Sequence, residues 1–200
     1  MNSTLTLTDC VLADHRSIRE LIADFKSEYS SPEGKTNAFR ALSLLVESHA
    51  KAEEATVLEL ARGEADLRPH ALESLEEHVV TDELVTKIRM TEDFESWEAR
   101  GKVYCDILEH HLTEEEKDLF PEVEARLTND ASAKLAHKYL QLRGLSLGLA
   151  NGELDDGQLS LIAGIFNPLY SETGRIGYVV AWLLGVPAWL LFIVFLMRGH

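Results

Sequence analysis

The chain has 200 residues, of which 34 are Asp or Glu and 19 are Lys or Arg, so its net charge at neutral pH is −15. Such an acidic surface repels nucleic acid and offers no basic patch to anionic lipid, which excludes both as electrostatic partners. Two cysteines, Cys10 and Cys105, are too few for a disulfide scaffold and indicate a reducing compartment. The first 30 residues contain no long apolar run, so we expect no secretory signal peptide.

Hydrophobic residues recur at steps of three and four, which predicts amphipathic helices. Prolines and glycines mark where these helices begin or break: Pro32, Gly34, Gly63, Pro69 and Gly101. We therefore expect an all-α fold with four long helices at about residues 9–29, 36–62, 70–90 and 94–127. A fifth, weaker helix is indicated at 132–150, and turn-forming Asn-Gly, Asp-Gly and Asn-Pro pairs follow it.

Residues 176–197 form an uncharged run of 22 residues, which as a helix would extend roughly 33 Å. This length crosses a bilayer core of about 30 Å, so a C-terminal transmembrane helix is predicted, with a buried packing helix or an oligomerisation segment as the alternative. Because no signal peptide precedes it, we expect a single-pass tail anchor with the N-terminal domain in the cytoplasm. The predicted domains are a helical bundle at 1–130, a helical or irregular connector at 131–175 and the transmembrane helix at 176–197.

One arrangement of potential metal ligands occurs twice in the chain. Each copy has a histidine that follows an acidic residue and then, 34 or 33 residues later, a His-x3-Glu motif. The first copy consists of His15, His49 and Glu53, and the second consists of His78, His111 and Glu115. Four imidazoles and two carboxylates suit a pair of metal ions held inside a helical bundle.

Each of these six side chains lies on the apolar stripe of its predicted helix. His15, for example, falls in one stripe with Val11 and Ile18. An ionised carboxylate on such a stripe is costly unless it is paired or bound to a cation. A lone histidine such as His15 is often an ordinary core residue, and His49 with Glu53 is compatible with a surface hydrogen-bonded pair. The repeated spacing favours a metal site over both alternatives.

Residues 9–127 resemble the hemerythrin-like HHE cation-binding family, including the segment from Glu115 to Pro121, which reads Glu-Glu-Lys-Asp-Leu-Phe-Pro. The resemblance implies an up-down-up-down four-helix bundle with a lone histidine on the first and third helices and His-x3-Glu on the second and fourth. It further implies that two iron ions are held by His15, His49, His78 and His111 and bridged by Glu53 and Glu115. Imidazole and carboxylate ligands suit iron, with manganese or zinc as alternatives.

The chain departs from the oxygen-carrying hemerythrins at two places. Their third helix has two histidines four residues apart, whereas Ser74 and Asp82 flank His78 here. Either Asp82 fills this position or one iron keeps an open or water-filled site. Those carriers also use His-x4-Asp on the fourth helix, which His110 with Glu115 would match; His111 is preferred because residues 110 and 115 lie about 140° apart on a helix.

Two classes of function follow from this resemblance. The first is a non-haem di-iron protein that binds or senses oxygen, nitric oxide or peroxide at a membrane. The second is a di-iron oxidoreductase that acts on peroxide, nitric oxide or ferrous iron, with the incomplete third-helix ligand set as the reactive position. Iron storage or trafficking, with the acidic surface attracting cations, is a further alternative.

Overall fold

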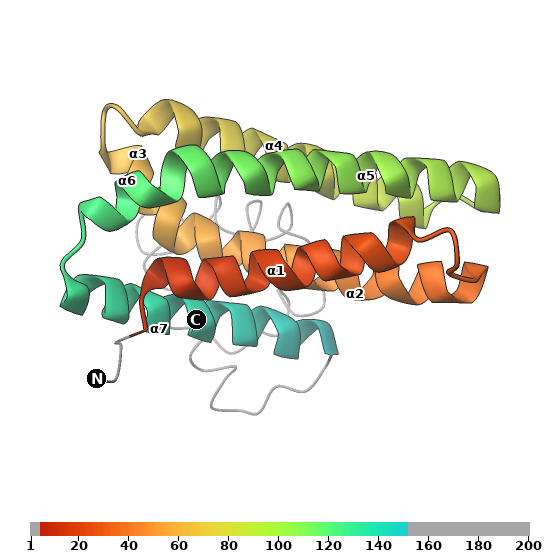
Figure 1. Ribbon diagram of the computed structural model, residues 1–200, viewed down its shortest axis with the longest axis horizontal. Coiled ribbons are helices and arrows are strands. Elements are labelled where there is room, and N and C mark those ends of the chain that lie inside the picture. The colour runs from red at the N-terminus through yellow and green to blue at the C-terminus, as the bar shows by residue number, and fades with distance from the viewer. Residues whose placement is uncertain (1–4, 152–200) are drawn as a thin grey trace, which may run out of the picture. The chain divides into compact units, whose positions relative to one another are not determined.

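The computed structural model describes residues 5–151, and this part of the chain is helical throughout apart from short loops (Figure 1). The all-α prediction is therefore confirmed for these residues. None of their helices has both the length and the apolar character that a membrane span requires. The predicted transmembrane helix at 176–197 lies outside the described residues, as does the connector beyond residue 151.

Four long helical rods form the bundle, joined by short loops at 27–31, 64–67 and 90–93. The first rod is α1 (Leu7–Lys26) and the third is α4 (Arg68–Arg89). The second rod is α2 (Pro32–Glu53), η1 (Glu54–Leu58) and α3 (Glu59–Gly63); the fourth is α5 (Phe94–Glu114), η2 (Glu115–Leu119) and α6 (Phe120–Ala125). Short loops make neighbouring rods antiparallel, and α1 packs against α2 while α4 packs against α5 (Figure 1).

Polar side chains fix the start of three rods. At α1, the Thr6 hydroxyl accepts the Asp9 backbone N–H, while the Asp9 carboxylate accepts the Thr6 N–H. At α2, Ser31 accepts the Gly34 N–H and is followed by proline, whose missing donor costs nothing in the first turn. At α5, Asp93 accepts the Ser96 N–H. These caps satisfy donors that have no partner within the helix.

Both His-x3-Glu rods contain a π-helical turn, η1 or η2, where the sequence predicted regular helix. In η1 the Thr56 hydroxyl donates to the Ala52 carbonyl at 2.7 Å, so a side chain occupies an acceptor of the regular ladder. In η2 the cause is Pro121, which follows the turn at the start of α6. A proline cannot donate to the carbonyl four residues earlier and clashes with it, and the wider turn relieves that clash.

The core consists of two apolar clusters on either side of a polar layer. The first contains Val11, Val57 and Leu119, and the second contains Ile18 and Leu108. Along every rod the histidine or the glutamate of the predicted ligand set lies between residues of the two clusters. The polar layer is therefore enclosed by apolar side chains at both ends.

A fifth long helix, α7 (Asn129–Asn151), packs along α1 and α2. The sequence predicted a weaker helix at 132–150 that lay within a connector, and the structure extends that helix and joins it to the bundle. The Ser132 hydroxyl accepts the Leu7 N–H at 2.9 Å, and the buried Tyr139 side chain belongs to the first apolar cluster. The first compact unit of the chain accordingly runs from Met1 to Glu153.

A substitution at Gly101 tests how tightly the second apolar cluster is packed. A Cβ atom at this position would lie 2.2 Å from Cζ of the buried Phe25 ring, whereas a Cβ atom at Gly144 of α7 meets nothing within 4 Å. Gly101→Ala is expected to lower the free energy of unfolding by about 1–3 kcal/mol through overpacking. Gly144→Ala is expected to raise it by about 0.5–1 kcal/mol through helix propensity. Urea unfolding followed by circular dichroism measures both, and equal stability of the two variants would contradict the packing described.

Candidate metal centre

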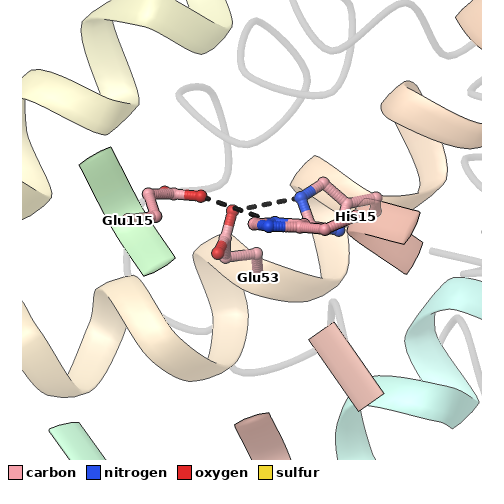
Figure 2. A group of neighbouring side chains, drawn as sticks. His15, Glu53 and Glu115 are labelled. Carbon is pink, nitrogen blue, oxygen red and sulfur yellow. Dashed lines mark ion pairs between the residues drawn. The ribbon is translucent and has the colours of Figure 1, made fainter. Parts of the chain in front are cut away.

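The six predicted ligands lie together in the polar layer, where they form two groups. His15 and His49 form the first group with the two glutamates, and His78 and His111 form the second group with the same two glutamates. The potential ligand atoms within each group all lie within 4.8 Å of one another, and every residue is buried. Figure 2 shows the Glu53 and Glu115 carboxylates directed toward each other beside the His15 ring.

Each glutamate faces one histidine of each group. Glu53 Oε2 lies 3.5 Å from His49 Nε2 and 3.6 Å from His78 Nε2. Glu115 Oε2 lies 3.7 Å from His15 Nε2 and 3.3 Å from His111 Nε2. Two ligands that are each about 2.1 Å from one ion, at 90–110° to each other, are separated by about 3.0–3.4 Å. The His111 distance lies in this range and the other three exceed it by 0.1–0.3 Å, so small shifts of these side chains would bring them to two cations that share both carboxylates.

Six side-chain atoms of this layer have no hydrogen-bond partner although they are buried. They are Nε2 of His15 and His49 and both carboxylate oxygens of Glu53 and Glu115. Leaving a buried polar group unpaired costs about 1–3 kcal/mol, and more for a charged group. All six atoms belong to side chains whose ligand atoms lie within 4.8 Å of one another, so a cation there would meet at least one lone pair from each side chain. The residues thus fit a metal.

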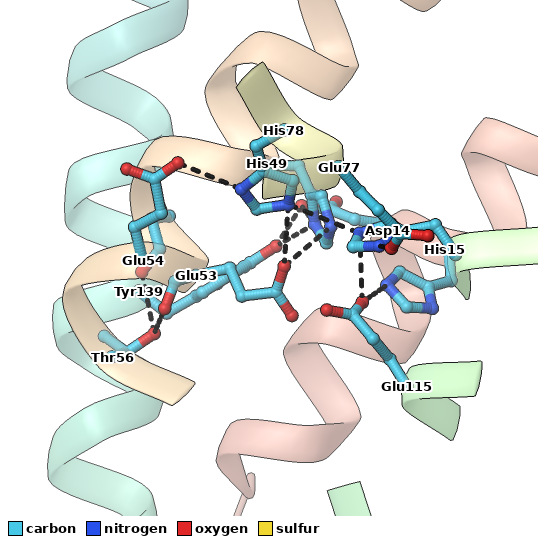
Figure 3. Close-up of polar contacts among 12 residues, drawn as sticks. Asp14, His15, His49, Glu53, Glu54, Thr56, Glu77, His78, Glu115 and Tyr139 are labelled. Carbon is cyan, nitrogen blue, oxygen red and sulfur yellow. Dashed lines mark hydrogen bonds and ion pairs between the residues drawn. The ribbon is translucent and has the colours of Figure 1, made fainter. Parts of the chain in front are cut away.

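The other ring nitrogen of each of the four histidines has a defined partner, and Figure 3 shows the pairing of His78 with Glu54. His15 Nδ1 pairs with Glu116 at 2.9 Å, His78 Nδ1 with Glu54 at 2.9 Å and His111 Nδ1 with Glu77 at 2.7 Å. His49 Nδ1 pairs with the Tyr139 hydroxyl at 2.7 Å. Such outer contacts fix the ring orientation and direct Nε2 toward the centre. These partners were not predicted from the sequence. The second glutamate of each pair, Glu53-Glu54 and Glu115-Glu116, was a usable signal.

Burial shifts the pKa values of the histidines and the glutamates in this layer in opposite directions. It lowers the pKa of His15 to about 4 and lowers the pKa of His49 well below its usual range, so both rings are neutral and able to donate a lone pair. Burial raises the pKa of Glu115, and burial together with the Glu115 charge raises the pKa of Glu53. Burial alone would lower the pKa of His111, but contacts with Glu115 and Glu77 outweigh burial and raise that pKa. Without a cation the layer therefore retains protons, which metal binding releases.

Asp82 and His110, the two alternatives from the sequence, lie outside the buried groups. Asp82 is exposed and belongs to neither of them. The His110 side chain is 65% exposed and lies 3.4 Å from Glu114 on the same helix. Of the two neighbouring histidines, His111 is the one that faces the layer.

A small cavity adjoins the second group. Its volume is about 10 Å³, close to the space that one water-sized probe needs. Aliphatic side chains and three of the four histidines surround it: Ile18, Val46, Leu108, Leu112, His49, His78 and His111. Glu77 and Thr81, on either side of His78 in the sequence, also line it. The second group thus has room for a small molecule beside its imidazoles.

The raised pKa of Glu53 predicts how the metal-free protein responds to pH. A carboxyl whose pKa is raised by folding loses its stabilising contribution as the pH rises toward its folded-state pKa. Above about pH 6.5 the buried His15 and His49 are neutral whether the chain is folded or not, so they add no opposing term. The metal-free chain should therefore become less stable from pH 6.5 upward.

Glu53→Gln removes this charge with little change of shape. At pH 8 the metal-free variant is expected to be more stable than the metal-free wild type by about 1–3 kcal/mol. Urea unfolding at several pH values measures the difference, with Glu83→Gln, at an exposed carboxyl of α4, as the matched control. The same pH dependence in Glu53→Gln and wild type would show that Glu53 is not buried as described.

Comparison with known proteins agrees with this geometry. The family model described as the hemerythrin HHE cation binding domain matches residues 6–123, from the cap of α1 to α6. No curated protein and no solved structure matches the chain. The matched domain and the buried His/Glu groups together fit a metal site. The chain therefore belongs to the hemerythrin HHE cation-binding family.

Proposed function

We propose that this protein is a non-haem di-iron protein that binds or senses oxygen or a related small ligand such as nitric oxide or peroxide. The observation that carries the proposal is the set of six buried, unpartnered donor atoms on four histidine and glutamate side chains that converge on one volume. His15, His49, His78 and His111 would each supply one nitrogen, and Glu53 and Glu115 would bridge. Bound iron would supply the centre that coordinates the small ligand.

The donor set favours iron over other cations. Imidazole and carboxylate suit iron, manganese and zinc, whereas a structural zinc site is closed by four protein ligands. Here each histidine pair has only two further ligands, and both of these are shared with the other pair. This sharing leaves coordination positions that the protein does not fill. Two irons per chain are therefore the expected content, with manganese or zinc as substitutes.

The surrounding residues support a small, uncharged ligand. Ile18, Val46, Leu108 and Leu112 present only aliphatic groups to the cavity, so they exclude bulk water from it. Because the cavity adjoins His78 and His111, a molecule in it would lie beside the second histidine pair. The Nδ1 contacts of these two rings with Glu54 and Glu77 hold their orientation while the ligand enters and leaves.

We further propose that the protein is anchored to a membrane. The support for this proposal is the uncharged run at 176–197, which is long enough to act as a tail anchor and would leave the helical domain in the cytoplasm. The anchor would hold the metal centre near membrane-bound consumers or transporters of the small ligand. Vesicle flotation of the full chain, compared with a chain that ends at Glu153, tests this part separately.

A di-iron oxidoreductase acting on peroxide, nitric oxide or ferrous iron is the alternative, and the feature that favours it is the exposed position of Asp82. Because Asp82 lies outside both groups, the third helix contributes His78 alone, and an unfilled position suits turnover as well as binding. Iron storage would use the same layer as an entry site.

Iron content and spectra separate these functions. The full chain is purified without oxygen, iron per chain is counted, and absorption is recorded after oxygen, nitric oxide or peroxide is added. Two irons and a reversible spectral change support binding; continued consumption of the added ligand supports an enzyme; uptake far above two irons supports storage.

Glu53→Gln and Glu115→Gln are expected to lower iron content at least tenfold at limiting iron, because each glutamate is shared by both groups. Asp82→Asn, the exposed control, is expected to keep two irons. Equal loss in Asp82→Asn would contradict the proposed ligand set, and wild-type protein that takes up no metal would overturn the function.

A further inference from the structure

The outer contacts of the four histidines differ between the two halves of the bundle. In the second half, Glu77 precedes His78 and its carboxylate contacts His111 Nδ1 at 2.7 Å. The matching residue of the first half is Asp14, which precedes His15. Asp14 Oδ2 lies 4.0 Å from His49 Nδ1, beyond hydrogen-bond distance. Aspartate is one methylene shorter than glutamate, and this difference opens the gap.

Tyr139 of α7 fills this gap (Figure 3). Its hydroxyl lies 2.7 Å from His49 Nδ1 and donates to Asp14 Oδ2 at 2.8 Å. Since a carboxylate only accepts, the phenol oxygen receives the His49 Nδ1–H. The side chain is fully buried, and Arg143, one turn further along α7, donates to the same Asp14 oxygen at 2.6 Å.

The contact is an addition to the matched domain. The family match ends at residue 123, whereas Tyr139 and Arg143 lie on the helix after it. Three histidines thus pair with a carboxylate that belongs to the four rods, and only His49 pairs with a neutral hydroxyl from α7. A carboxylate makes an imidazole a stronger electron donor than a phenol does.

We propose that Tyr139 is a positioning residue that sets the cation affinity of the site formed by His15 and His49 and leaves the site formed by His78 and His111 nearly unchanged. This inference rests on the proposed function. The His15–His49 site is the weaker of the two, because one of its rings lacks a carboxylate partner. Helix α7 thereby supports the weaker of two sites that are similar in their inner ligands.

The test is a titration of the metal-free full chain with cobalt(II), a spectroscopic probe for imidazole and carboxylate ligands. Absorption and heat are recorded together. Wild type is expected to bind two cobalt ions in two steps. Tyr139→Phe keeps the ring but removes the hydroxyl, and is expected to weaken the second, weaker step by about 10–100-fold. The tighter step should change by less than about twofold.

Two variants keep the result specific to the hydroxyl. Tyr104→Phe is the matched control, because Tyr104 is equally buried but belongs to the second apolar cluster. It is expected to leave both steps unchanged. The double variant Asp14→Glu/Tyr139→Phe tests rescue, since the longer acid should reach His49 as Glu77 reaches His111. It is expected to restore the weaker step to within about threefold of wild type.

The outcomes distinguish failure of the role of Tyr139 from failure of the proposed metal-binding function. A wild-type chain that binds no cobalt overturns the metal site and the inference together. If wild type binds two cobalt ions and Tyr139→Phe weakens both steps equally or weakens neither, only the role of Tyr139 is overturned. An equal effect of Tyr104→Phe overturns it as well, because general loosening of the core would then account for the change.

Discussion

The structure depends on two carboxylates that share one dry layer. The side chains of Glu53 and Glu115 are 0% and 2% exposed, and no hydrogen bond reaches their four oxygens. Two such groups repel each other when ionised and lose their hydration when buried. Apolar clusters on both sides keep water out, so the compensation has to come from within the layer. Cations held between the carboxylates and the imidazoles would provide it.

The doubled glutamates follow from the same constraint. Consecutive residues on a helix point about 100° apart, so two adjacent glutamates cannot both face the centre. Glu53 faces inward while Glu54 turns to the His78 ring, and Glu116 likewise contacts His15 on a different rod. A π turn begins at or directly after each inward glutamate, which widens the helix where both orientations are needed. The inward carboxylate and the carboxylate that orients a histidine ring thus come from one dipeptide.

Helical periodicity predicted the rods and the grouping of the six buried side chains because both depend on which face a residue occupies. The same rule was too coarse for Asp82 and Thr81: relative to His78 they lie about 40° and 60° to either side, and neighbouring helices decide that Thr81 is buried. Pro121 inside a predicted helix was the available signal for η2. Tyr139 had no signal, since its partners are 90 and 125 residues away in the chain and pair with it only after α7 docks.

The repeated motif suggests two equal sites, yet the two halves have diverged in what surrounds them. The first half is closed by α7, whose Tyr139 and Arg143 engage Asp14 behind the His49 ring. The second half has no such cover within the described residues, and the cavity touches both of its histidines. A small molecule in this cavity would lie beside the two rings that both have carboxylate partners. One histidine pair is therefore backed by α7 through His49, and the other adjoins the cavity through both of its rings.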